Sequence, residues 1–308
     1  MVDEIVYDEF ALFHENAEEW SLPWNGPPTV ERVDVPVGPG QVVSALKWGE
    51  DAPELVFLHG GGQNAHTWDT ALLALGRPAI AVDLPGHGHS SWRSDRDYWP
   101  WSNAQAVATV LDTFVIRPRA VVGMSLGGLT TIRLAAIRPD LVPRALIVDV
   151  TPGVHRRAIE MTIEERGSTA LIGGPREYTS FDEMVDAVVA LTPNRPRSAL
   201  RRGVLHNARP LGDGRWQWRY DIGGSADDAS RRDVPDFTEL WDDIGRIDVP
   251  LLLVRGGDSQ FVLEEHLEEL RARKPDAEVV VVPDAGHAVQ SDQPLVLRDL
   301  IAHFVDAD

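Results

Sequence analysis

The amino-acid sequence predicts an α/β fold built on a mostly parallel sheet. Short apolar or β-branched runs recur along the chain, and helical stretches separate many of them. Four of these runs, "LVFL", "AIAV", "ALIV" and "LLLV", are continuously apolar, which is typical of strands covered on both faces. The predicted strands are Val30–Val37, Val42–Trp48, Leu55–Leu58, Ala79–Val82, Ala120–Met124, Ala145–Val150, Pro250–Val254 and Glu278–Val282.

The first two predicted strands alternate polar and apolar residues more than the others, which indicates an antiparallel edge of the sheet. The later strands alternate with helical stretches, as expected of parallel strands joined by helices. We therefore expect an eight-stranded, mostly parallel sheet flanked by helices. The predicted helices are Thr67–Leu75, Asn103–Phe114, Leu126–Ile137, Leu263–Ala272 and Leu295–Phe304.

The alternation fails between Thr151 and about Arg246. Gly and Pro there separate short helical pieces, "FDEMVDAVVAL" and "RSALRRGVLHNA", and a strand-like "RWQWRY". A structureless loop of that length is improbable in a compact domain. We expect residues 151–246 to form an inserted, mainly helical lid between the two parts of one core domain, residues 1–150 and 247–308.

Composition disfavours two classes of partner and excludes the chemistry of cysteine. Lys and Arg number 29 against 48 Asp and Glu, so the net charge of −19 disfavours nucleic acids and anionic membranes. The absence of cysteine excludes disulfides and cysteine nucleophiles. The acidic start "MVDEIVYDEFALF" is unlike a signal peptide, and no apolar run approaches the roughly 18 residues of a membrane span. We expect a cytoplasmic protein, and the sequence leaves the oligomeric state open, a homodimer included.

Ser125 stands where a predicted strand turns into a predicted helix. Gly123-Met124-Ser125-Leu126-Gly127 fits the pattern G-x-S-x-G, which needs that strand-turn-helix context. The glycines permit a sharp turn, and the helix N-terminus adds partial positive charge where an oxyanion would form. A glycine-rich turn with an incidental serine is the alternative interpretation.

A serine hydroxyl needs a base to remove its proton, and the base needs a carboxylate to orient it. In this kind of fold the acid and then the histidine follow the serine, at the ends of later strands. Asp258 follows the strand in "PLLLVRGGD", and His287 follows the strand in "VVVVPDAGH". The order and the strand-end positions therefore both fit a Ser-Asp-His triad.

Three further motifs make the sequence resemble the α/β-hydrolase superfamily over most of its length: "FLHGGG", "DLPGHGHS" and "GHAVQSDQP". The resemblance implies that Ser125 attacks an acyl carbon, His287 transfers the proton and Asp258 orients the imidazole. It also implies that the backbone N–H groups of Leu126 and Gly61 bind the oxyanion.

Two other carboxylates compete with Asp258 for the role of the acid. Asp149 lies beyond the sixth strand, where some members of the superfamily carry their acid, and Asp284 is close to His287 in sequence. The strand-end position favours Asp258.

The substrate pocket is less well defined by the sequence. Large aromatic rings near the "DLPGHGHS" turn and in the insertion would make an apolar pocket wall, although core or lid packing explains them equally well. The candidate pocket residues are His59, Gly60, Trp92, Trp216, Trp218 and Trp241. For His59, a hydrogen bond to backbone is the alternative. Arg201, Arg202, Arg215 and Arg219 would bind a substrate carboxylate or lie on a solvated face.

No metal and no cofactor are expected. The "HGH" of His87–His89 has no third ligand at a recognisable spacing, and the glycine-rich motifs lack the spacing of nucleotide-binding loops. We expect a serine hydrolase of a small neutral or hydrophobic acyl compound, a carboxylic ester or lactone, that acts through an acyl-enzyme. A carbon–carbon bond hydrolase of a diketone-like substrate and a ligand-sensing receptor without turnover are the alternatives.

Overall fold

A computed structural model of the chain describes residues 7–114, 116–221 and 235–307. Its main sheet has eight strands in the order β1-β2-β4-β3-β5-β6-β10-β11, which confirms the predicted fold class. The strands are β1 (Val30–Gly38), β2 (Gln41–Trp48), β3 (Leu55–Leu58), β4 (Ala79–Val82), β5 (Ala120–Met124), β6 (Ala145–Val148), β10 (Leu251–Gly256) and β11 (Glu278–Val282).

The antiparallel edge is also confirmed. β1 pairs antiparallel with β2, and β2 pairs antiparallel with β4. Every other pairing in this sheet is parallel. The carboxyl ends of the parallel strands therefore meet at one edge, which is where a parallel sheet collects functional side chains.

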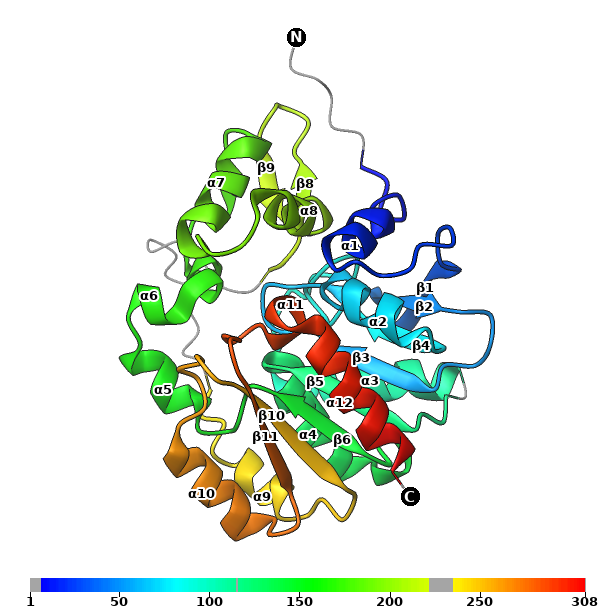
Figure 1. Cartoon of the computed structure of the whole chain (residues 1–308), viewed down its shortest axis with the longest axis vertical. Helices are drawn as coiled ribbons and strands as arrows, with labels where there is room; N and C mark the ends of the chain where they lie inside the picture. The colour runs from blue at the N-terminus through cyan, green and yellow to red at the C-terminus, as the bar shows by residue number, and fades with distance from the viewer. Residues whose placement is uncertain (1–6, 115, 222–234, 308) are drawn as a thin grey trace.

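Helices cover both faces of the sheet (Figure 1). In β3, Val56 and Leu58 belong to one buried cluster and Leu55 and Phe57 to the other, because successive side chains of a strand point to opposite faces. The core helices are α1 (Phe13–Glu19), α2 (Asp69–Leu75), α3 (Pro100–Thr113), α4 (Leu126–Ile137), α9 (Leu240–Ile244), α10 (Glu264–Arg273), α11 (Val289–Asp292) and α12 (Pro294–Asp306), with 3-10 turns η1 (Ala65–Trp68) and η2 (Pro139–Leu141).

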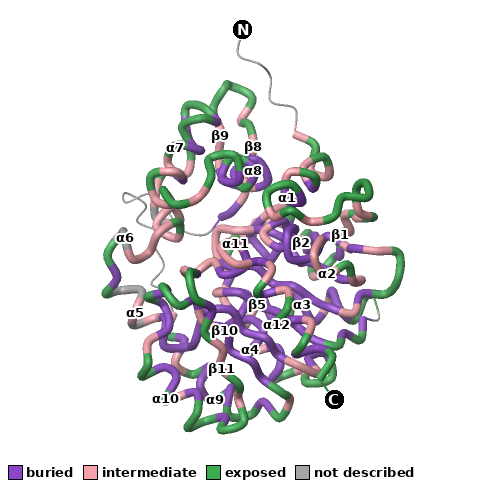
Figure 2. Tube along the Cα trace, in the orientation of Figure 1, coloured by how far each residue is buried: buried purple, intermediate pink, exposed green. Residues whose placement is uncertain are grey.

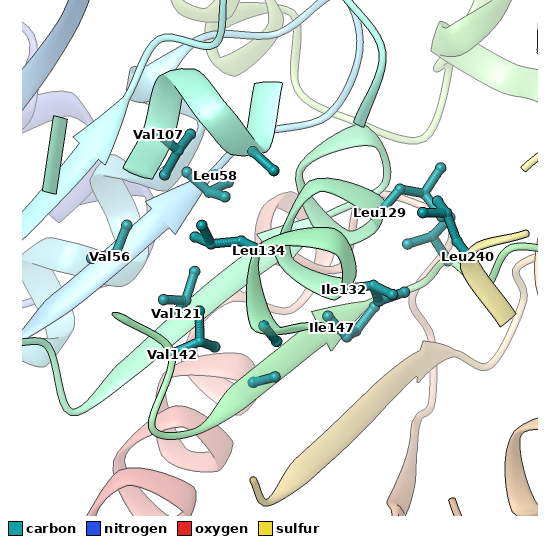
Figure 3. Close-up of a cluster of buried hydrophobic side chains, with 14 of the residues drawn as sticks. Val56, Leu58, Val107, Val121, Leu129, Ile132, Leu134, Val142, Ile147 and Leu240 are labelled. Atoms are coloured by element: carbon teal, nitrogen blue, oxygen red, sulfur yellow. The ribbon is translucent and has the colours of Figure 1, made fainter. Parts of the chain in front are cut away.

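Burial follows this layering, and the central strands are the most consistently buried part of the trace (Figure 2). Helix α4 carries apolar side chains over much of its surface because it packs against the sheet and against neighbouring helices. Figure 3 shows Leu134 beside Val121 and Leu58, and Leu129 beside Leu240 of α9. The helix that follows Ser125 is thereby fixed against the core.

The segment after β6 forms a separate layer above the carboxyl edge of the sheet (Figure 1). Its own buried cluster includes Phe181, Met184, Leu200 and Trp218. Its elements are α5 (Val154–Glu160), α6 (Ile163–Arg166), η3 (Gly167–Gly173), β7 (Glu177–Tyr178), α7 (Phe181–Leu191), α8 (Arg197–Asn207), β8 (Ala208–Pro210) and β9 (Trp216–Trp218).

The predicted end of the insertion at residue 246 lies too far along the chain. Helix α9 packs against α4 and α10, and its Leu240, Trp241 and Ile244 lie in the cluster of the core. Residues 222–234 of the predicted lid lie outside the described residues. Helix α1 was not among the predicted helices, because the residues in and around it show neither helix nor strand periodicity.

Within the described residues, no helix combines the length and the apolar character that a membrane crossing requires.

Gly127 should be essential for the contact between α4 and β3. A Cβ atom on Gly127 would lie 2.2 Å from the Leu58 carbonyl oxygen, so Gly127→Ala forces the helix away from the strand. We expect a loss of several kcal/mol in the free energy of unfolding, on the order of 2–4. Chemical denaturation measures it. Gly203→Ala in α8 is the matched control, because its Cβ would meet no atom within 4 Å. It should raise stability by about 0.5–1 kcal/mol, and equal losses in both variants would contradict the argument.

Candidate active site

Ser125 occupies a sharp turn between β5 and α4. Its backbone has φ 51° and ψ −117°, in the region of positive φ that a side chain rarely adopts. The turn is compact because Gly123 and Gly127 touch, and a Cβ on Gly123 would lie 2.3 Å from the Gly127 carbonyl oxygen. The first intrahelical bond runs from the Leu129 N–H to the Ser125 carbonyl, at 3.0 Å. The N–H groups of the first turn, including that of Leu126, are therefore available to an acceptor outside the helix.

His287 contacts a buried carboxylate, and that carboxylate belongs to Asp149. The His287 Nδ1 atom lies 2.8 Å from Asp149 Oδ2, with side-chain exposures of 10% and 0%. Asp149 follows β6 directly and has a positive φ of 51°. Two further donors reach its oxygens: the Gly256 N–H at 2.9 Å and the Ser259 hydroxyl. The charge of this buried carboxylate is thus compensated by hydrogen bonds from three sides.

Asp258, which the strand-end rule favoured, does not contact His287 in the structure. It is exposed, and its backbone N–H donates to the Ala285 carbonyl at 2.9 Å. The turn after β10 instead directs Ser259 inward, toward Asp149. The structure therefore contradicts the predicted contact of Asp258 with His287 and places Asp149, the alternative beyond the sixth strand, in that position.

Two residues that hold this arrangement were not predicted, because no motif in the sequence marks them. Phe261 stacks on the His287 ring with centroids 3.7 Å apart and an interplanar angle of 18°. Ser259 donates to Asp149 and also accepts the Phe261 N–H at 3.2 Å. The His287 Nε2 atom is buried and has no hydrogen-bond partner among the described residues. With Nδ1 directed to Asp149, Nε2 is the nitrogen left to exchange a proton with another group.

The loop after β3 packs directly beside Ser125. A Cβ on Gly60 would lie 3.2 Å from the Ser125 Cβ and 2.5 Å from the Met124 sulfur, so only glycine permits this approach. His59 is fully buried below the loop, where it accepts from the Leu84 N–H at 2.9 Å and donates from Nδ1 to the Gly60 carbonyl at 2.7 Å. His59 therefore bonds to backbone and does not line the pocket.

One cavity of about 1410 Å³ brings the predicted site residues together. The predicted residues that line it are Gly60, Gly61, Ser125, Leu126, Asp258 and His287. Its aromatic lining residues come from both layers and from the N-terminal segment. They are Trp20, Tyr98, Trp99, Tyr178, Phe237 and Phe261.

The four tryptophans predicted for the pocket do not line this cavity. Trp92 lies under the Arg209 guanidinium, 4.5 Å from it, and Trp216 packs on Phe181. Trp218 lies in the buried cluster of the insertion, and Trp241 lies in the core. Their packing interpretation is the one that the structure supports, since large rings bury well in either cluster.

The "DLPGHGHS" turn has a structural role in this protein. The buried Asp83 accepts the N–H groups of Ala65 and His89 and a guanidinium bond from Arg32 at 2.8 Å. Burial alone would raise the pKa of Asp83, but Arg32, His59 and these N–H groups outweigh burial and lower it. Gly88 is required because its Cβ would lie 2.3 Å from the Asp83 carboxyl carbon.

A second ionic cluster lies where the N-terminal segment meets η1 and α8. His66 has both ring nitrogens on carboxylates, Nδ1 at 2.9 Å from Asp69 and Nε2 at 3.3 Å from Glu9. Its ring stacks on His206 at 3.8 Å, and the Tyr7 hydroxyl lies 2.8 Å from His206 Nδ1.

His66, Asp69 and His206 have ligand atoms within 4.8 Å of one another, which is close enough for a metal. A histidine that faces two carboxylates is a doubly protonated donor, however, and has no lone pair for a metal. We therefore interpret the cluster as an ion-pair network.

This network predicts a loss of stability at alkaline pH. Burial would lower the pKa of His66 from its ordinary value of 6.5, and the nearby Arg32 acts in the same direction. The carboxylates of Asp69 and Glu9 outweigh both effects and raise the pKa to about 9. A raised pKa in the folded state contributes stability that is complete below pH 6.5 and is lost as pH rises through about 9. The free energy of unfolding should fall across this window by at most about 1.4 kcal/mol per pH unit.

Urea titrations at a series of pH values measure this slope. His66→Gln should flatten the slope between pH 6.5 and 9, and His303→Gln, at an exposed position on α12, should leave it unchanged. A wild-type slope that persists in His66→Gln would assign the effect to another group.

Known proteins with similar sequences share this fold. The esterase Rv0045c of Mycobacterium tuberculosis is 50% identical over 301 residues, which are 97% of this chain and 96% of that protein. The sn-1-specific diacylglycerol lipase ABHD11 of Mus musculus is 29% identical over 262 residues, 82% of this chain and 81% of its own length. A structure of Rv0045c, solved in work on its transition metal inhibition, has a TM-score of 0.85 at 49% identity and covers 98% of this chain and 100% of that one.

A more distant structure, that of E-2-(acetamidomethylene)succinate hydrolase, has a TM-score of 0.73 at 23% identity. It covers 91% of this chain and 100% of that chain, and it supports the fold alone. The model of the alpha/beta hydrolase family matches residues 55–300, from β3 into the last helix. Together with the eight-stranded sheet and the serine turn, this match shows that the chain belongs to the alpha/beta hydrolase family.

Proposed function

We propose that the protein is a serine hydrolase that cleaves a neutral or hydrophobic carboxylic ester through an acyl-enzyme. The observation that carries the proposal is the contact between His287 Nδ1 and the buried Asp149, which leaves Nε2 without a partner among the described residues of the cavity that Ser125 also lines. A buried carboxylate on Nδ1 fixes the tautomer in which Nε2 accepts a proton.

Each residue has a defined role in this proposal. Ser125 attacks the acyl carbon, and His287 takes its proton and gives it to the leaving alcohol. Asp149 orients the imidazole and stabilises the imidazolium that forms. The N–H groups of Leu126 and Gly61 donate to the oxyanion of the tetrahedral intermediate. Water then hydrolyses the acyl-enzyme by the same proton transfers.

The substrate class follows from the walls of the cavity. Six aromatic residues line it, so an apolar acyl or alcohol part gains contact area there. The four arginines considered from the sequence lie outside this cavity and have other partners: Arg202 pairs with Glu19, and Arg215 pairs with Glu177 and Asp213. Arg219 donates to the Ala208 carbonyl, and Arg201 lies over Phe181. The 50% identity to an esterase supports an ester as the substrate class.

Ser125 should react with a fluorophosphonate probe, because an activated serine attacks phosphorus as it attacks an acyl carbon. Mass spectrometry of a digest should place the adduct on Ser125, and Ser125→Ala should abolish both labelling and turnover of p-nitrophenyl esters. Lactones and vinylogous diketones in the same assay compare the other substrate classes. Labelling without turnover of any acyl substrate would support a ligand-sensing receptor instead.

Asp149 and Asp258 form a matched pair for testing the acid. Asp149→Asn places an amide against Nδ1 and favours the wrong tautomer of His287, so kcat should fall by about 10⁴. Asp258→Asn changes an exposed side chain and should leave kcat within about 3-fold of the wild type, a margin that corresponds to a small surface effect. Ester hydrolysis measured for both variants checks this. The reverse ranking would restore Asp258 as the acid.

A further inference from the structure

The loop that carries Gly61 contains three successive glycines, Gly60, Gly61 and Gly62, so its own sequence leaves it conformationally free. In the structure it is fixed by hydrogen bonds from two directions. We call residues Gly60–Asn64 the glycine loop. One set of bonds comes from the core below it, and the other comes from helix α8 of the inserted layer above it.

The first set fixes the peptide unit that joins Gly60 and Gly61. Its carbonyl, that of Gly60, accepts from His59 Nδ1 at 2.7 Å and from the Gln63 N–H at 3.2 Å. In a trans peptide the N–H points opposite to the C=O. Because the Gly60 carbonyl is directed to His59 and Gln63, the Gly61 N–H is directed away from them. The Gly60 N–H, in turn, donates to the Gln63 side chain at 3.0 Å and is not free for an oxyanion.

The second set of bonds comes from the last residues of α8. Asn207 Nδ2 donates to the Gly62 carbonyl at 2.5 Å, and Asn64 Nδ2 donates to the His206 carbonyl at 3.0 Å. Asn207 is itself fixed within the inserted layer, since its carbonyl accepts the Arg219 N–H at 2.8 Å. The Gly62 carbonyl belongs to the same peptide unit as the Gln63 N–H, and that N–H donates to the Gly60 carbonyl.

These bonds form one continuous connection from α8 to the Gly61 N–H, through the peptide unit of Gly62 and Gln63 and then that of Gly60 and Gly61. We propose that Asn207 is a positioning residue for the oxyanion donor Gly61 N–H, so that the inserted layer takes part in transition-state stabilisation as well as covering the cavity. The inference rests on the proposed function, in which Gly61 N–H binds the oxyanion. Asn207 does not line the cavity that holds Ser125, and its side chain contacts the glycine loop instead.

The test compares Asn207→Ala and Asn207→Asp with the wild type. Both variants remove the amide donor, and aspartate keeps the size of the side chain if alanine impairs folding. Displacing a catalytic group by about 1 Å can reduce a rate by about 10², so kcat should fall by about 10–100-fold. KM should change by less than about 3-fold, because ground-state contacts with the substrate are intact. The affinity for an alkyl boronic acid, which forms a tetrahedral adduct on the serine, should fall by the same factor as kcat/KM.

Arg197→Ala is the matched control on the same helix. The Arg197 guanidinium donates to Asp186 of α7 at 2.6 Å and has no contact with the glycine loop. Arg197→Ala removes a contact of the same helix on the exposed surface and should keep kcat near the wild-type value. Wild-type kcat in both Asn207 variants, or an equal loss of kcat in Arg197→Ala, would overturn the assignment of Asn207.

The proposed function is judged separately in the same experiment, by the wild type and Ser125→Ala. An active wild type and an inactive Ser125→Ala, together with normal Asn207 variants, would reject the positioning role alone. A wild type that turns over no ester would reject the proposed function itself.

Discussion

The hydrogen bond between Asp149 and His287 sets the geometry on which the rest of the site depends. A fully buried carboxylate is costly unless donors surround it. Here the donors come from the ends of two other strands: Gly256 at the end of β10 and Ser259 just after it, and His287 after β11. Asp149 therefore links the ends of β6, β10 and β11 by hydrogen bonds, and it also orients the ring of His287. Asp149 itself has a positive φ of 51°, and Phe261 stacks on the ring of His287.

The parts of this protein that local sequence pattern determines were predictable. Continuous apolar runs marked the strands covered on both faces, and the glycines around Ser125 marked the strained turn, because only a residue without Cβ fits there. The carboxylate that contacts His287 was harder to predict. Asp149 and Asp258 both follow buried strands, and the sequence does not state which one turns its side chain inward. That choice depends on backbone angles and on where Ser259 is directed, which only the folded turn decides.

The cavity walls were the least predictable feature, because they are made by packing between layers. Tryptophans of the insertion were expected to face the substrate, yet Trp216 and Trp218 stabilise the insertion's own cluster. Trp20, which does line the cavity, follows a helix that the sequence pattern did not indicate. The role inferred for Asn207 was equally hidden, since it depends on α8 ending directly above the glycine loop.

The family match begins at Leu55, but the ionic support of the site begins much earlier in the chain. Glu9 pairs with Arg32 at 2.7 Å, Arg32 pairs with Asp83 at 2.8 Å, and Glu19 of α1 reaches Arg202 of α8. A recombinant fragment trimmed to the matched residues would lose the antiparallel edge of the sheet and leave Asp83 as a buried charge without its cation. Boundaries for producing this protein are therefore better chosen from its ion pairs than from the extent of similarity to its family.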